Sequence, residues 1–396
     1  MRFTLAVLLA SSAVSLAGAN IDANQAGGLT VHEWGTFTSV AGEDGSAVEW
    51  GTLDCRDDLP KFVNEFGFGF KFGLRGTVRM ETPVIFFYSP SHVEAHVKVT
   101  FPNGLMTEWY PQARYQIYQK SQDGEIRQLP ENFSGIDLSM RRLTGSIEWS
   151  NVQVEPDAAP NLPLENAPSR YYAARATDAA PVTVGEQHEK FLFYRGVARI
   201  PVPLSVRVER DGRIAVQNSG NEPVPVAILF ENRGGHIGFR DVGAITDGVM
   251  VDRPSPDGSA AALRYQLEEA LIAQGLFPAE ARAMLETWQD SWFEEGTRLI
   301  YILSSRAVDG ILPLHIDPVP SETARVFVGR IEMVTPEMEN SVGQAIAKAD
   351  WSALARYGRF LDPILTRISS EGDVQAQQIE HFRTELLPQL GINQCH

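Results

Sequence analysis

The sequence has only two cysteines, few basic residues and no common cofactor-binding signature. It contains no Walker loop, dinucleotide fingerprint, His-Glu-x-x-His pair, Cys-x-x-Cys-His haem site or Gly-x-Ser-x-Gly elbow, so we expect no nucleotide cofactor. Its 34 Lys and Arg residues are outnumbered by 50 Asp and Glu residues. This acidic excess argues against nucleic acid as a partner and against binding to anionic lipid.

Long hydrophobic runs are also missing, and the clearest apolar stretch is N-terminal. Arg2 precedes an apolar run at residues 5–10, and Ala17-Gly18-Ala19 supplies small residues for cleavage. This pattern predicts a cleavable signal peptide over residues 1–19, with a retained anchor as the alternative. Cleavage would remove Arg2 and no acid, changing the net charge from −16 to −17. We therefore expect a periplasmic or secreted protein with no stable membrane insertion after cleavage.

The two cysteines, Cys55 and Cys395, lie near opposite ends of the mature chain. In an oxidising compartment they are expected to form one disulfide. The loop it closes is long, so the chain-entropy model gives a stabilisation of about 5 kcal/mol. Metal binding by Cys395 with His396, or a thiol-based redox role, are the alternatives.

The hydrophobic pattern predicts a fold that is mainly β with α additions (α+β). Residues 20–154 are expected to form an N-terminal β domain, because residues 30–40 are rich in β-branched and aromatic side chains. Residues 93–101 alternate apolar and polar side chains, Pro102-Asn103-Gly104 follows, and residues 105–110 are again strand-like. This arrangement predicts a β-hairpin.

The rest of the chain divides by composition and periodicity. Residues 155–181 are rich in proline and predict a linker or long loop, and residues 182–258 predict a β-meander or sandwich. Within the meander, residues 204–208 alternate apolar and polar side chains, Asp211-Gly212 predicts a turn, and residues 214–217 return. Residues 259–335 predict an αα-hairpin, with Ser259 as N-cap, Gly275 as the stop and Pro278 opening the second helix. Strands are expected to return at residues 299–303, 311–316 and 325–334. Residues 336–396 predict a C-terminal helical segment, in which Thr335-Pro336 opens one helix, Asp350 caps another and a third runs near residues 373–388. The overall expectation is two β-sandwich-like regions with an inserted αα-hairpin.

The best metal candidate in the sequence is His92-Val93-Glu94-Ala95-His96. A strand projects every second side chain from one face, so His92, Glu94 and His96 would point the same way. Two imidazoles and a carboxylate suit zinc, iron or copper, and His32 is a possible fourth ligand. The alternative is that these residues form the solvent-exposed face of an edge strand, with Lys98 as the next polar residue on that face.

Two further groups could carry chemistry. Glu294 and Glu295 follow Trp292-Phe293, and a carboxylate beside aromatic side chains suits general acid–base catalysis. Tyr194, Arg195 and His236 are candidates for substrate binding, since arginine binds anionic groups through two hydrogen bonds. Helix-end or structural ion pairs are the alternative in each case.

Four of the seven tryptophans follow a glutamate, at Glu33-Trp34, Glu49-Trp50, Glu108-Trp109 and Glu148-Trp149. Exposed tryptophans would suit sugar binding. On a strand, however, adjacent residues face opposite sides, which favours tryptophan in the core and glutamate in solvent.

Several phrases resemble those of an uncharacterised group of exported bacterial proteins that carry an HEWGTFT-like N-terminal motif. They are His32 to Thr38, Met80-Glu81-Thr82-Pro83-Val84, Thr107-Glu108-Trp109-Tyr110-Pro111 and Trp292 to Arg298. The resemblance covers most of the mature chain and implies bacterial export. The group has no established activity, so the resemblance assigns no catalytic residue.

These patterns favour a metal-dependent hydrolase. His92, Glu94 and His96 would bind a divalent metal, with His32 as the candidate fourth ligand, and Glu294 or Glu295 would act as general base. The substrate would be an unidentified small molecule or polymer. The alternative is a non-catalytic envelope protein that binds polysaccharide or another protein through a β-sandwich.

Overall fold

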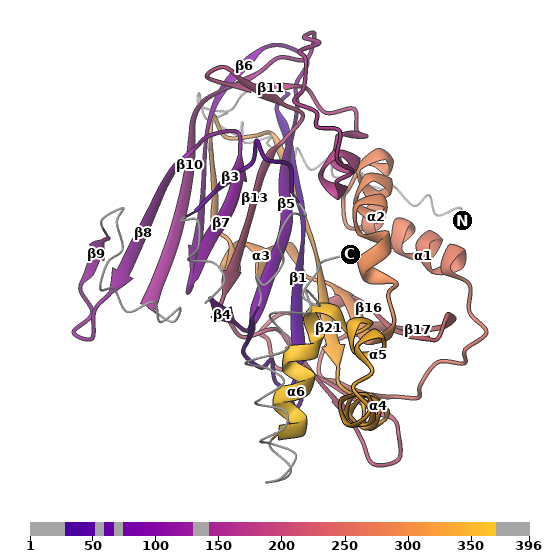
Figure 1. Cartoon of the computed structure of the whole chain (residues 1–396). Helices are drawn as coiled ribbons and strands as arrows, with labels where there is room; N and C mark the ends of the chain where they lie inside the picture. The colour runs from indigo at the N-terminus through magenta and orange to yellow at the C-terminus, as the bar shows by residue number, and fades with distance from the viewer. Residues whose placement is uncertain (1–27, 52–58, 67–73, 130–141, 370–396) are drawn as a thin grey trace, which may run out of the picture.

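The computed structural model describes residues 28–51, 59–66, 74–129 and 142–369, which fold as a mainly β protein with a few helices (Figure 1). No helix within these ranges is long and apolar enough to cross a membrane. The proposed signal peptide, Cys55, Cys395 and the helix expected near residues 373–388 lie outside the described residues.

A nine-stranded sheet forms the centre of the described molecule, and β1 (Thr30–Ala41) lies in its middle. β1 pairs in parallel with β21 (Glu322–Met333) and antiparallel with β5 (Val78–Tyr88). The first described strand is therefore paired with the last one. The segments that the sequence predicted as separate domains contribute strands to the same sheet. The remaining strands of this sheet are β3 (Asn64–Glu65), β7 (Gly104–Tyr110), β13 (Leu192–Ala198), β16 (Val224–Arg233), β17 (His236–Ile245) and β19 (Gly296–Ile302).

A second sheet of seven strands is built around β6 (Val93–Pro102) and β10 (Leu143–Val154). Val97, Val99 and Phe101 of β6 share one hydrophobic cluster with side chains of the nine-stranded sheet, such as Phe37 and Ile85. The other strands of this sheet are β8 (Arg114–Lys120), β9 (Ile126–Gln128), β11 (Val182–Val184), β12 (Gln187–Glu189) and β20 (Leu314–Asp317). The large common core explains why long stretches of both sheets are apolar.

The hairpin predicted at Pro102-Asn103-Gly104 is wrong. β6 pairs with β10 and β20, whereas β7 pairs with β13 and β3, so the chain crosses from one sheet to the other at this turn. Asn103 has a φ of 55°, which asparagine and glycine tolerate. The turn signal was correct, but a local turn does not specify whether the two strands pair. Seven consecutive buried residues in β7 match a strand covered on both faces.

Smaller elements complete the β part. β14 (Leu204–Val208), β15 (Ile214–Asn218) and β18 (Gly248–Val251) form a three-stranded sheet, and β2 (Trp50–Gly51) pairs with β4 (Arg75–Gly76). The alternation and the Asp211-Gly212 turn predicted the β14–β15 hairpin, which is confirmed by the pairing of Leu204 with Asn218 and Val208 with Ile214.

The αα-hairpin is confirmed as α1 (Ala260–Ala273) and α2 (Pro278–Trp292). It covers one face of the nine-stranded sheet, where Leu263, Leu267 and Trp288 pack with Trp34 and other sheet residues (Figure 1). Within 311–316, expected to be a strand, the helix α3 (Ser305–Ile311) ends and β20 begins at Leu314.

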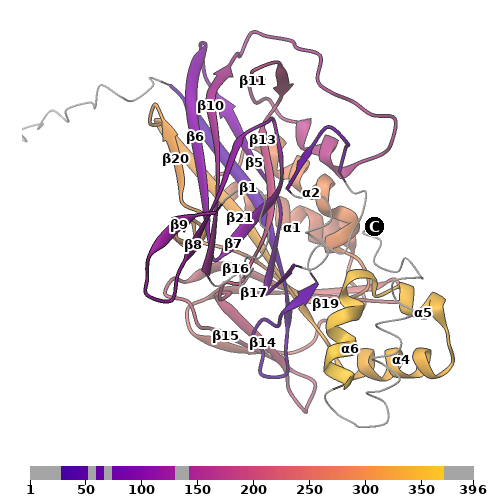
Figure 2. The ribbon, with the colours of Figure 1, turned by 60° about the vertical axis from the view of Figure 1, so that its left-hand side comes forward.

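The described part of the C-terminal segment is helical, as expected. α4 (Pro336–Ala347), α5 (Trp351–Ala355), the 3-10 helix η4 (Gly358–Phe360) and α6 (Leu361–Ser369) pack around Val40 and Trp50 (Figure 2). Thr335 caps α4 and Asp350 caps α5, as their sequence predicts. The sheet face under the helices thus carries two apolar clusters, one below α1 and α2 and the other below α4 to α6.

Candidate functional site

A hollow of about 670 Å³ opens where β5 ends, beside the proline-rich segment 155–181. Its volume lies within the range of roughly 300–1,000 Å³ that is typical of small-molecule sites. Proline and alanine make most of the wall, including Pro90, Pro156, Pro160, Pro181, Ala158, Ala159, Ala179 and Ala180. The segment expected to be a linker or loop therefore forms one side of a cavity. A short 3-10 helix, η3 (Arg170–Arg175), holds it against α2.

Four polar side chains interrupt this apolar wall: Tyr88 at the end of β5, Ser89 just after it, Asp178 from the proline-rich segment, and Lys190 from the segment before β13. The Ser89 hydroxyl donates to the carbonyl of Ser91 at 2.6 Å. The Lys190 ammonium donates to the carbonyl of Thr177 at 2.9 Å. This hydrogen bond holds the ammonium next to the residue that precedes Asp178 in the sequence. Asp178 is exposed and Lys190 half-buried. The hollow thus combines both signs of charge with apolar surface.

Tyr88 is linked to a buried acid–histidine pair under the first turn of α2. Its hydroxyl donates to Glu280 Oε1 at 2.9 Å, and the other oxygen of Glu280 accepts from Phe277 N at 2.7 Å and lies 2.8 Å from His32 Nδ1. Glu280 is completely buried, and its position at the start of α2 places it at the positive end of the helix dipole. One carboxylate therefore organises three groups from three parts of the chain.

His32 keeps one ring nitrogen unused. It is 1% exposed, and its Nε2 has no hydrogen-bond partner within the described ranges. The rings of Phe277 and Tyr88 lie over it, with centroid separations of 4.4 Å and 5.6 Å. Buried polar atoms are normally paired, and this unpaired one belongs to a residue that reaches the hollow only through Glu280 and Tyr88.

The pKa of Tyr88 is raised above its ordinary value, first by burial and then by the charge of Glu280, its hydrogen bond to Glu280 and the charge of Asp178. The hydroxyl consequently keeps its proton at physiological pH and directs it to Glu280. Only the lone pairs of the Tyr88 oxygen remain for another molecule.

The predicted substrate residues Tyr194 and Arg195 are buried in the fold instead. The Tyr194 hydroxyl donates to Glu33, which also pairs with Arg325 at 2.6 Å. Arg195 makes two hydrogen bonds to Glu108, at 3.0 Å and 2.9 Å. Burial and the charge of Glu33 raise the pKa of Tyr194 well above its ordinary value. These are the structural ion pairs that the sequence left open as the alternative.

The prediction that the glutamates preceding tryptophan face solvent is wrong for Glu33 and Glu108. Trp34, Trp50, Trp109 and Trp149 are buried, as core packing requires, but Glu33 and Glu108 are completely buried too. Both faces of the nine-stranded sheet are covered, so alternation cannot send these carboxylates to water. They are matched by arginines from neighbouring strands.

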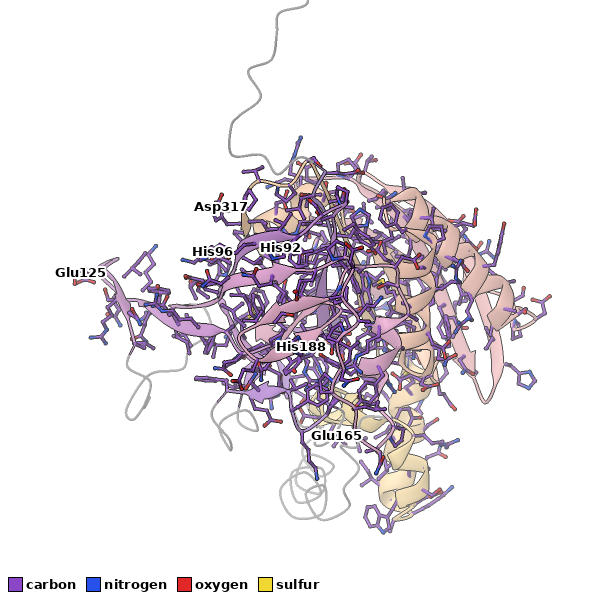
Figure 3. The ribbon with its side chains drawn as sticks, turned by 90° about the horizontal axis from the view of Figure 1, so that it is seen from above. His92, His96, Glu125, Glu165, His188 and Asp317 are labelled. Carbon is purple, nitrogen blue, oxygen red and sulfur yellow. The ribbon has the colours of Figure 1, made fainter. Side chains whose placement is uncertain are left out.

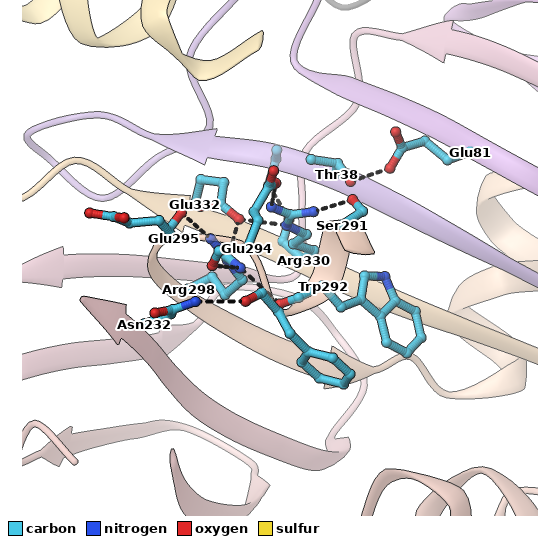
Figure 4. A network of polar contacts seen from close by, with 12 residues as sticks. Thr38, Glu81, Asn232, Ser291, Trp292, Glu294, Glu295, Arg298, Arg330 and Glu332 are labelled. Atoms are coloured by element: carbon cyan, nitrogen blue, oxygen red, sulfur yellow. Dashed lines mark hydrogen bonds and ion pairs between the residues drawn. The ribbon is translucent and has the colours of Figure 1, made fainter. Parts of the chain in front are cut away.

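The predicted catalytic pair lies at the other end of α2 (Figure 4). Arg298 donates to the carbonyls of Trp292, Glu294 and Glu295 at 2.7–2.8 Å and so caps the end of the helix. The Glu294 carboxylate pairs with Arg330, which also donates to Ser291 at 2.7 Å. Glu295 faces a hollow of about 180 Å³ with Glu337 and Tyr357.

Two buried arginines share Glu332 in this same network. Arg298 lies 2.7 Å from Glu332, and Arg330 contacts the same oxygen. Burial lowers the pKa of Arg298. Burial opposes the charge of Arg330 as well, but Glu332 and Glu294 raise its pKa overall. Opposite charges balance here, as expected of a structural network.

The predicted metal ligands contact separate polar partners. His92 lies 2.7 Å from Gln153, which donates to Glu94 at 2.9 Å, while His96 lies 3.7 Å from Glu148 and opposite Asp317 on β20 (Figure 3). His32 belongs to the other sheet. Within the described ranges, no group of three or more His, Cys, Asp or Glu residues could hold a metal ion. His236 is exposed at the start of β17.

Sequence reasoning missed most of the residues around the hollow. Lys190 lies four residues before Tyr194 in a segment that the sequence suggested for anion binding, but Tyr88, Asp178 and Glu280 carried no motif. A glutamate at the third position of a helix that opens with proline is a recognisable start signal, and this one could have drawn notice to Glu280. Its pairing with His32, 248 positions away, has no local signal.

No family model matches the chain, and no curated protein does. Among solved structures it is similar to the yeast delta-COP-I mu-homology domain complexed with a WxWxV peptide, at 7% sequence identity. That match covers 78% of this chain and 96% of the other, with a TM-score of 0.27, and at that score it supports no argument.

Proposed function

We propose that the chain is an exported protein that binds a small polar molecule in the hollow beside Tyr88. The observation that carries the proposal is the convergence of Tyr88, Asp178 and Lys190 on one cavity, with Tyr88 fixed from behind by Glu280 and His32. A few well-placed polar groups in an apolar cavity are what ligand sites generally present. Export rests on the leader at residues 1–19, and N-terminal sequencing of the protein from its host tests it.

A small ligand is favoured over a polysaccharide. Polymer binding through stacked sugars needs exposed aromatic platforms, whereas six of the seven tryptophans are buried and Trp351 is half-buried. The hollow also has a bounded volume.

Filling the hollow tests the proposal. Ala159 is exposed and lines the cavity, while Ala176 is equally exposed but does not line it. Saturation-transfer NMR with a fixed panel of amino acids, short peptides, sugars, amines and carboxylic acids should detect at least one binder. We expect binding to persist in Ala176→Trp and to be lost in Ala159→Trp. No binder at all, or equal binding in both variants, would refute the proposal.

A metal-dependent hydrolase is the second candidate. It rests on the sequence alternation of His92, Glu94 and His96, because the described residues contain no group of three or more His, Cys, Asp or Glu placed to hold a metal ion. Metal analysis of purified protein loaded with zinc should then give one bound ion, reduced in His96→Ala and His92→Ala. Equal metal content in all three proteins would remove this candidate.

A further inference from the structure

We infer that the ligand of the hollow is a zwitterion carrying a primary ammonium and a carboxylate, such as a free amino acid or a short peptide. The inference rests on the proposed function and deepens it. It follows from which hydrogen-bonding roles each polar group of the hollow has left after its internal contacts are counted.

The first role belongs to Tyr88. Its hydroxyl donates a hydrogen bond to Glu280, and its raised pKa keeps the hydroxyl protonated. The Tyr88 oxygen can therefore only accept a hydrogen bond from a ligand. Glu280 cannot rotate away, because Phe277 N also donates to it and His32 Nδ1 lies 2.8 Å from it. His32 and Glu280 are therefore positioning residues that convert an ambivalent hydroxyl into a fixed acceptor.

The second role belongs to Asp178, which adds negative charge to the same wall. It is exposed, lines the hollow, and makes no ion pair within 4.0 Å in the part of the chain that the structure describes. A carboxylate and a hydroxyl oxygen that both accept are suited to an ammonium, which has three protons to donate.

The third role belongs to Lys190, which supplies the opposite charge. One of its three protons is used by the Thr177 carbonyl, which leaves two for an anionic group. Lys190, Asp178 and the Tyr88 oxygen line one hollow, and Lys190 and Asp178 do not form an ion pair. This arrangement matches a ligand that carries a positive and a negative group at separate positions. A simple anion would meet Asp178, and a simple cation would meet Lys190.

The wall favours short, small side chains on the ligand. Ala158, Ala179 and Ala180 with the surrounding prolines present only methyl and ring carbons. We therefore choose L-alanyl-L-alanine as the probe. Two relatives each lack one charge: N-acetyl-L-alanyl-L-alanine has no ammonium, and L-alanyl-L-alaninamide has no carboxylate.

Isothermal titration with these three probes tests the inference. We expect the dipeptide to bind and each capped relative to bind roughly tenfold to a hundredfold more weakly, because each loses a charge-assisted hydrogen bond. Lys190→Met should abolish the preference over the amide only, and Asp178→Asn the preference over the acetylated probe only. Lys120→Met, an exposed lysine on β8, is the control and should change neither.

Loss of folding cannot produce this result, because each of the two variants loses its preference over one capped probe and keeps its preference over the other. If the dipeptide and alanine both fail to bind while another panel compound binds in a manner blocked by Ala159→Trp, this inference is wrong and the proposed function stands. If nothing binds, both fail. Equal affinity for the three probes also overturns the inference.

Discussion

The two ends of α2 contain similar chemistry used in opposite ways. At the C-terminal end, Arg298 and Arg330 are buried and matched by Glu332, Glu294 and helix carbonyls. At the N-terminal end, Glu280 and His32 are equally buried, but His32 Nε2 is unpaired and Tyr88 extends the contacts to an open hollow. What separates the two ends is the hollow of about 670 Å³ that Tyr88 lines, rather than the burial of charge.

Both ends also stabilise the helix. A carboxylate at the first turn and a guanidinium at the last complement the helix dipole. Buried charge is therefore expected at either end, and it suggests a ligand site only where it is linked to a cavity of sufficient volume. The following predictions test this contrast, from the largest expected effect to the smallest.

Removing Glu332 should give the largest loss of stability. Glu332→Ala leaves two buried guanidinium groups without their shared carboxylate, so the free energy of unfolding should fall by about 3–5 kcal/mol. Glu209→Ala, which breaks the more exposed pair with Arg207, should cost less than about 1 kcal/mol. Urea denaturation measures both. A loss below 1 kcal/mol for Glu332→Ala would mean that the closed end is not structural.

Glu280→Gln should have an intermediate effect on stability and a strong one on binding. The amide of glutamine cannot accept from all the groups that contact Glu280, so the loss should be about 1–3 kcal/mol. Dipeptide affinity should fall at least tenfold because Tyr88 is no longer fixed. Glu294→Gln is the matched variant at the other end, and titration should find its affinity unchanged. A fall in both variants would erase the contrast.

Tyr88→Phe should change stability by only about 1 kcal/mol, since one hydrogen bond to Glu280 is lost. It removes an acceptor for the ammonium, so the preference for the dipeptide over its acetylated form should shrink. Ser291→Ala removes a hydroxyl from the closed end and should leave this preference intact. Thermal unfolding and calorimetric titration report the two effects, and an unchanged preference in Tyr88→Phe would contradict the role given to Tyr88.

The smallest expected effect is on the stability of the protein at alkaline pH. The folded pKa of Tyr88 is raised above the unfolded value of about 10, so the unfolded chain loses its proton first. The stability from this group is present below pH 10 and is lost as the pH rises further. Tyr88→Phe should flatten the decline in melting temperature above pH 10, and Ser291→Ala should not. Parallel declines in all three proteins would exclude this contribution.

Local signals in the sequence predicted the helices well. Ser259, Gly275, Pro278 and Thr335 stand at the helix boundaries where propensity and capping place them. Strand pairing was less accessible, because the partner of β1 is almost 300 residues away and the turn at Asn103 joins two sheets rather than two paired strands.

The buried charges explain why the candidate site was missed. A carboxylate on a strand was expected to face water, yet Glu33 and Glu108 are buried and pair with arginines on adjacent strands that are distant in the sequence. The strands β13, β19 and β21 each carry arginine within a mainly apolar sequence, and this was an available signal for charge pairing. The residues are Arg195, Arg298, Arg325 and Arg330. Which charge remains unsatisfied depends on tertiary packing alone.

A crystal structure of the protein soaked with L-alanyl-L-alanine tests the central claim most directly. We predict density for one dipeptide in the hollow, with its ammonium against Asp178 and the Tyr88 oxygen and its carboxylate against Lys190. A dipeptide bound elsewhere, or a hollow that stays empty at a concentration that saturates binding in solution, would contradict the account.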